Sequence, residues 1–197
     1  VREDDFKESR LPLFLSPFSK PFLSSKELKM GSVDFGADEI FEMAQQVERN
    51  GALFYRKAAS LAKAAGSAPF FLKLAAMEDA HEKVFALMRG ELTAAERMKR
   101  ISDPENQGPA YLRAWADRQV FDVRSDPAER ITGREGPEDI LRMAIGLEKD
   151  SVVFYLGMKN AVPERLGRAR VDEIIQEEMG HIGLLSRELQ TLAHQML

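Results

Sequence analysis

Four stretches of the chain repeat apolar residues every three or four positions, which is the spacing of one buried face of an α-helix. The first stretch starts near Asp38, the second follows a turn at Gly66 and Ser67, the third follows Pro137, and the fourth follows Gly167. No stretch of useful length alternates apolar and polar residues at every second position, as a half-buried strand would. We therefore predict an all-α fold built on four helices.

The segments outside these helices have a different composition. Residues 92 to 137 contain several prolines and glycines and are predicted to form a long connection between the second and third helices. Within this connection the pattern of Tyr111, Leu112, Trp115 and Val120 suggests a short helix. We expect the buried face of the second helix to hold Phe70, Leu74, Met77, His81, Val84 and Met88.

Residues 1–36 are predicted to be an N-terminal arm, and residues 37–197 the helical domain. Prolines at three positions break helical periodicity in the arm and favour extended structure. The arm is either poorly ordered or an extended strap that docks on this chain or on a sister subunit. Its docking side chains would be Phe14, Phe18 and Phe22.

The two halves of the helical domain repeat each other when the chain is shifted by 100 positions. The shift matches Glu48 with Glu148, Phe54 and Tyr55 with Phe154 and Tyr155, Glu78 with Glu178, and His81 with His181. Two of the three histidines thus have a glutamate three residues before them and a second glutamate at the same distance upstream. Chance is a poor explanation for such a match.

The repeated residues suit a metal site. Residues three apart lie on one face of a helix, so each histidine and the glutamate before it can reach one bound ion. The other two glutamates, Glu48 and Glu148, fall on the apolar faces of their own helices. Burying unpaired carboxylates is costly, and four close together would also repel one another.

Two divalent cations would remove this cost. No Lys or Arg lies on the inner faces, and two such ions bring four positive charges to four carboxylates. Carboxylate and imidazole ligands suit iron or manganese, with zinc as an alternative. One Glu from each of two helices and a Glu-x-x-His from each of the other two is the known ligand pattern of di-iron carboxylate bundles. We therefore predict two iron ions held by Glu48, Glu78, His81, Glu148, Glu178 and His181.

Composition excludes other chemistry and bounds the partners. The chain has no cysteine, which excludes disulfides, iron–sulfur centres and thiol nucleophiles. A net charge of −4 gives no reason to expect nucleic acid or anionic membrane as partners. No run approaches the roughly 20 apolar residues of a membrane span, and the apolar run at 11–18 is broken by prolines. We expect a cytoplasmic protein.

The segments VERNGALFY…MEDAHEKVF and LEKDSVVFY…QEEMGHIGLL resemble the ferritin-like, rubrerythrin-related proteins over roughly residues 37 to 195. This resemblance implies a ferritin-like antiparallel four-helix bundle with a long crossover between helices two and three. It also implies a di-iron centre with Glu78 and Glu178 between the metals, His81 and Glu48 on one side, and His181 and Glu148 on the other. Which outer glutamate serves which metal stays open.

Two departures from the rubrerythrin pattern bear on activity. Full-length rubrerythrins carry a cysteine-ligated iron domain that this chain lacks, so electrons would come from an external donor. Ser151 stands where rubrerythrins place an additional glutamate, so peroxidase activity does not follow from the resemblance.

The pattern predicts an oxidoreductase that reacts with dioxygen or peroxide, in a homodimer or larger homo-oligomer. Three alternatives stay open: a ferroxidase or iron-storage protein, a di-iron hydroxylase of a hydrophobic substrate, and a structural metal-binding bundle. Tyr55 and Tyr155 are expected to donate hydrogen bonds to ligand carboxylates or to carry radicals, unless they are ordinary core aromatics. Gly51 and Ser151 would leave space beside the metals, and close helix packing is an equal explanation for Gly51. Glu82, Glu173, Glu177 and His194 are expected on the solvent side.

Overall fold

The computed structural model describes residues 36–62, 67–98, 127–159 and 162–195. The chain divides into two units, Val1–Ser32 and Val33–Leu197, and every described residue belongs to the second. The predicted arm therefore lies outside the described residues except at Gly36, and so does the short helix suggested around Trp115. Both stay predictions.

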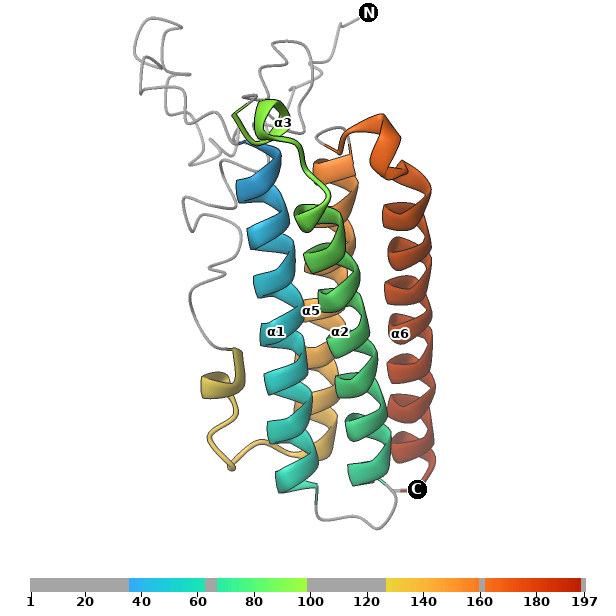
Figure 1. Cartoon of the computed structure of the whole chain (residues 1–197). Coiled ribbons are helices and arrows are strands. Elements are labelled where there is room, and N and C mark those ends of the chain that lie inside the picture. Colours follow the sequence, from blue (N-terminus) through green and yellow to red (C-terminus); the bar gives the residue numbers. More distant parts are fainter. Residues whose placement is uncertain (1–35, 63–66, 99–126, 160–161, 196–197) are drawn as a thin grey trace, which may run out of the picture. The chain divides into compact units, whose positions relative to one another are not determined.

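The described elements are helices, in agreement with the predicted fold class. They are α1 (Ala37–Leu61), α2 (Ser67–Gly90), α3 (Ala94–Met98), η1 (Pro127–Arg130), α5 (Pro137–Met158), η3 (Glu164–Leu166) and α6 (Arg168–Gln195). In Figure 1 the four long helices lie side by side, with α1 antiparallel to α2 and α5 antiparallel to α6. Because α2 and α5 run in the same direction, the end of α2 and the start of α5 lie at opposite ends of the bundle. The predicted antiparallel four-helix bundle with a long crossover is confirmed.

Local chemistry explains where the long helices begin. At the start of α1 the carboxylate of Glu39 accepts a hydrogen bond from the backbone N–H of Gly36, with an N–O distance of 2.7 Å. Asp139 accepts the equivalent bond from Gly136 at 3.1 Å before α5. These bonds satisfy backbone donors that have no partner within the helix. Gly167 takes a positive φ of 80° between η3 and α6, a conformation that a residue without a Cβ adopts at low cost.

The buried interior is divided into two apolar clusters with a polar layer between them. One cluster contains Phe41, Phe85 and Phe154, and the other contains Phe54 and Phe71. In each of the four long helices, buried polar residues separate the part of the helix in one cluster from the part in the other. The polar residues therefore meet near the middle of the bundle.

The buried face of α2 is rotated from the predicted one. Phe71 and Phe85 are fully or almost fully buried, whereas Phe70 and Val84 are half-buried. Apart from the adjacent pair at 74 and 75, the buried positions of α2 are three or four residues apart, as they are in packed helix pairs. They are Phe71, Leu74, Ala75, Glu78, His81, Phe85 and Met88. Adjacent aromatic residues at 70 and 71 fit the periodicity equally well, so the sequence pattern did not separate them.

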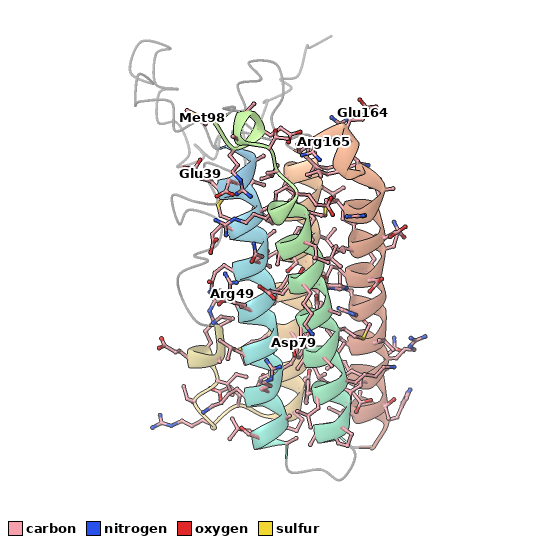
Figure 2. All side chains as sticks on the ribbon, viewed as in Figure 1. Glu39, Arg49, Asp79, Met98, Glu164 and Arg165 are labelled. Carbon is pink, nitrogen blue, oxygen red and sulfur yellow. The ribbon has the colours of Figure 1, made fainter. Side chains whose placement is uncertain are left out.

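Charged residues cover the outside of the bundle and join its elements. Arg49 on α1 binds Glu82 on α2, with a nitrogen–oxygen distance of 3.0 Å. Arg165 in η3 binds Glu96 in α3 at 2.8 Å, and Figure 2 shows Arg165 at the same end of the bundle as Met98. Among the described helices, none combines the length and the apolar character that crossing a bilayer requires.

Candidate metal centre

The six residues predicted as ligands come together in the polar layer of the bundle. Each of the four long helices contributes at least one of them, and every one is at most 4% exposed. They are Glu48 from α1, Glu78 and His81 from α2, Glu148 from α5, and Glu178 and His181 from α6. The repeat in the sequence therefore corresponds to two similar helical hairpins facing each other.

These residues form two overlapping groups of four. Within each group, one ligand atom from every residue lies within 4.8 Å of the others. The first group is Glu48, Glu78, His81 and Glu178, and the second is Glu78, Glu148, Glu178 and His181. Glu78 and Glu178 belong to both groups. The geometry thus groups Glu48 with His81 and Glu148 with His181, as the resemblance implied and as the spacing alone could not show.

The Nδ1 atoms of the two histidines face the carboxylates. His81 Nδ1 lies 2.9 Å from Glu178 Oε1 and 3.6 Å from Glu48 Oε2. His181 Nδ1 lies 3.1 Å from the other oxygen of Glu178 and 3.3 Å from Glu78 Oε1. The two rings are stacked with centroids 5.7 Å apart. Glu178 therefore lies between both imidazoles, one oxygen toward each.

Several buried atoms of this cluster have no hydrogen-bond partner among the described residues. They are Glu48 Oε2, Glu78 Oε1, His81 Nδ1, Glu178 Oε1 and His181 Nε2. His81 Nδ1 and Glu178 Oε1 are close enough for a hydrogen bond, but their orientation is not that of one. Unpartnered buried polar atoms are costly, and a cation that accepts the lone pairs of the carboxylate oxygens and of His81 Nδ1 would remove that cost for these four atoms. The donor set fits two divalent cations.

Burial and mutual repulsion raise the pKa of three carboxyl groups. Burial raises the pKa of Glu48 well above its ordinary value, and the charge of Glu178 raises it further. Glu78 shows the same direction, caused by burial and then by the charge of Glu148. The pKa of Glu148 is raised to about 8, again by burial first. Without cations, burial and mutual repulsion therefore favour the protonated form of these three groups.

The histidines respond in the opposite way to burial. Burial alone would lower the pKa of His81, but its contacts with Glu178 and Glu177 raise it to about 9. His181 is raised to about 12, because its contacts with Glu148, Glu178 and Glu78 outweigh burial. Burial and the charge of Glu78 would raise the pKa of Glu178, yet the two imidazoles hold it below the ordinary value. In the metal-free protein, protons on the imidazoles and on the carboxyl groups thus compensate the negative charge of the cluster.

Two buried phenols contact the outer carboxylates across the halves of the bundle. Tyr55 on α1 donates a hydrogen bond to Glu148 on α5, and Tyr155 on α5 donates to Glu48 on α1. Burial, followed by the nearby carboxylate charge, raises the pKa of both phenols well above 10. Both phenols therefore keep their protons and act as donors, as the hydrogen-bonding alternative predicted.

Glu177, which was expected on the solvent side, contacts one of the histidines of the cluster. Glu177 is 55% exposed, yet its Oε2 lies 2.9 Å from Nε2 of His81, on the side of the ring opposite the carboxylates. The signal in the sequence was a break in the repeat, since Met77 occupies the matching position. Glu173 and His194 are exposed as expected, and Glu82 is half-buried against Arg49.

A small cavity reaches the cluster between α1 and α5. It has a volume of about 20 Å³, and its lining includes Gly51, Ser151, Glu78 and Glu148. The predicted space beside the carboxylates is therefore present. The hydroxyl of Ser151 donates to the backbone carbonyl of Leu147 at 3.1 Å. Gly51 packs closely on the Glu78 side chain, since a Cβ there would lie 3.3 Å from Cγ and Oε2 of Glu78.

A crystal structure from Thermotoga maritima shares this architecture. The protein is described as a candidate ferritin-like diiron-carboxylate protein, and it superimposes on the chain with a TM-score of 0.64. The match covers 80% of this chain and 96% of the other, at 22% sequence identity. No protein-family model and no curated protein matches the sequence. At this identity the match speaks for the architecture, and the chain has a ferritin-like helical fold.

Proposed function

We propose that this chain binds two iron ions in the polar layer of its bundle. One ion would be held by Glu48 and His81, the other by Glu148 and His181, and Glu78 and Glu178 would serve both. The observation that carries this proposal is the pair of buried four-residue groups sharing two carboxylates. The T. maritima protein, described as a diiron-carboxylate protein, supports the same conclusion.

Iron is favoured by the ligand types. Carboxylate oxygens are hard ligands and imidazole is intermediate, a combination that suits iron or manganese better than a thiolate-seeking metal. Iron at such a site supplies one-electron redox chemistry together with Lewis acidity. The protein residues would hold the ions, exclude bulk water and keep the outer carboxylates fixed through Tyr55 and Tyr155.

We further propose that the site acts as an oxidoreductase on dioxygen or peroxide. The cavity beside Glu78 and Glu148 has about 20 Å³, which is room for one molecule of the size of water. A larger apolar cavity of about 260 Å³ is lined by Phe71, Ile140 and Leu192 but by none of the six ligands. Phe71, which lines that cavity, stacks on Tyr55 with ring centroids 6.3 Å apart, and Tyr55 in turn donates to Glu148. Beside Glu78 and Glu148, a small reactant is therefore favoured over a bulky hydrophobic substrate. A separate, more open groove of about 360 Å³ is lined by His81, Glu173 and Glu177.

Electrons for such a reaction would come from a separate donor, because the chain has no cysteine for an iron–sulfur or rubredoxin-type centre. The proposed homodimer or larger homo-oligomer would carry one di-iron site in each subunit.

The test loads the metal-free protein with Fe(II) without oxygen and measures bound iron by elemental analysis. Two iron ions per chain are expected, followed by consumption of dioxygen or peroxide as Fe(II) is oxidised. The variants Glu48→Gln and Glu148→Gln should each lower bound iron, whereas the exposed Glu173→Gln should not. Two bound ions with no consumption of either oxidant would contradict the oxidoreductase and leave a structural metal site. Light scattering on the same sample distinguishes a dimer from the closed shell that iron storage requires.

A further inference from the structure

The two proposed metal subsites differ in one contact outside the carboxylate cluster. His81 Nε2 lies 2.9 Å from the carboxylate of Glu177. His181 Nε2 is buried, and no described residue forms a hydrogen bond with it. Since Nδ1 of each ring faces the carboxylates, Nε2 points away from the proposed metal in both halves.

The sequence explains this difference. Glu177 directly precedes Glu178, and the equivalent position before Glu78 is Met77. A thioether is a weak acceptor, so Met77 does not replace a carboxylate as a partner for an imidazole N–H. The otherwise regular repeat is broken at the residue that touches one histidine.

The contact matters for metal binding because a histidine that ligates through Nδ1 carries its proton on Nε2. A carboxylate that accepts this N–H holds the ring in one tautomer and orientation and makes the ligating nitrogen more basic. His81 has this support. In His181 the N–H would be buried without a partner, which disfavours the ligating tautomer.

We propose that Glu177 positions His81 as a ligand, so that the subsite of Glu48 and His81 binds its ion first and more tightly than the subsite of Glu148 and His181. This inference rests on the proposed di-metal function and concerns the order in which its two subsites fill. Loss of such an outer contact lowers metal affinity by about 10- to 100-fold in other sites. Because Glu177 is 55% exposed, water competes for its carboxylate, and we expect an effect near the lower end of this range.

The wild-type protein gives the first test. Metal-free protein receives one equivalent of Zn²⁺ per chain, and anomalous diffraction measures the occupancy of each subsite. Zn²⁺ is chosen because it does not change oxidation state. The ion is expected between Glu48 and His81. Equal occupancy, or higher occupancy beside His181, would overturn the proposal.

Variants then test the role of Glu177 itself. Glu177→Ala should lower the affinity of the first Zn²⁺ by about tenfold in a chelator competition, and Glu177→Gln should lose less because its amide oxygen still accepts a hydrogen bond. Glu173→Ala is the matched control, since Glu173 carries the same charge as Glu177 and lines the same surface groove as Glu177 and His81. Unlike Glu177, Glu173 forms no hydrogen bond with His81 among the described residues. An equal loss of Zn²⁺ affinity in Glu173→Ala would show that the effect comes only from the negative charge of the groove, and it would contradict the proposal.

Exchanging the two residues provides the strictest test. The double variant Met77→Glu with Glu177→Met should move the first Zn²⁺ to the subsite of His181. If the first Zn²⁺ still binds beside His81 in this double variant, Glu177 does not set the order of filling. If the wild-type protein binds fewer than two Zn²⁺ ions, the di-metal proposal fails together with this one. If it binds two ions of equal affinity, the failure is limited to the order of filling.

Discussion

Single side chains bind the two halves of the polar layer to each other. Tyr55 comes from the first helical hairpin and contacts the outer glutamate of the second, while Tyr155 makes the reciprocal contact. Each phenol is also packed against a phenylalanine of α2, Tyr55 on Phe71 and Tyr155 on Phe85. The two phenols therefore connect the apolar clusters to the carboxylates between them.

Removing either phenol oxygen should destabilise the protein. Tyr155→Phe leaves Glu48 Oε1 buried without its donor, and Tyr55→Phe does the same to Glu148 Oε1. An unsatisfied buried acceptor costs about 1–3 kcal/mol, so urea unfolding of the metal-loaded protein should show a loss of that size. The two variants serve as controls for each other, because equivalent contacts predict similar losses. Unchanged unfolding curves would mean that the phenols do not hold these carboxylates in solution.

A second prediction concerns the glycine beside the cluster. Gly51→Ala places a methyl group 3.3 Å from Cγ and Oε2 of Glu78, so this carboxylate must move and metal affinity should fall. Alanine is also the better helix former by about 1 kcal/mol, so the metal-free variant should be as stable as wild type or more stable.

The matched control for this prediction is Ser151→Ala, at the equivalent position of the repeat. Its hydroxyl contacts a backbone carbonyl of its own helix, so its loss should leave metal affinity unchanged. Isothermal titration with Zn²⁺ and thermal unfolding measure both quantities. Equal Zn²⁺ affinities for Gly51→Ala and wild type would contradict the close packing of Gly51 on Glu78.

At the scale of whole elements, most of the architecture was predictable from the sequence. Pro137 and the turn before Ser67 indicated where helices begin, and three-to-four spacing indicated which of their faces are buried. The six-residue cluster was predictable because the repeat places the same residues on both hairpins. Periodicity could not choose between neighbouring aromatics such as Phe70 and Phe71, because that choice depends on the facing helix.

Contacts between residues of different helices also could not be predicted from the sequence. The bond of Glu177 to His81 joins α6 to α2, and its exposed position made it look like a solvated residue. The association of each outer glutamate with a histidine also depends on how the hairpins face each other. Spacing along one helix carries no information on this arrangement.

The α2 helix offers a test of its revised buried face. Phe85 is fully buried against Tyr155, and Phe85→Ala should lower the free energy of unfolding by about 3–5 kcal/mol. Leu87→Ala on the same helix is the control, because Leu87 is 65% exposed and its loss should change stability by at most about 0.5 kcal/mol. Urea unfolding measures both variants. Similar losses in the two would contradict the burial of Phe85 on the inner face of this helix.

For the molecule as a whole, protons and metal ions compete for the same buried charges. Without metal, raised pKa values keep protons on Glu148 up to about 8 and on His81 up to about 9. Metal ligands must release these protons, so metal binding should strengthen as the pH rises. Metal-free and metal-loaded proteins should therefore differ most in stability under alkaline conditions.

Thermal unfolding at increasing pH tests this competition. The folded-state pKa values of Glu148 and His81 lie above their ordinary values of 4.5 and 6.5, so the folded metal-free protein binds more protons than the unfolded chain. The resulting stabilisation is complete below the ordinary values and is lost as the pH rises through about 8 and about 9. The melting temperature of the metal-free protein should therefore fall between pH 6.5 and about 9, while the increase produced by saturating Zn²⁺ should grow over the same interval. Glu48→Gln with Glu148→Gln is the control, since it removes two of the buried acids and should flatten the dependence. A metal-free melting temperature that is constant or rises over this interval would show that the cluster does not hold its protons as described.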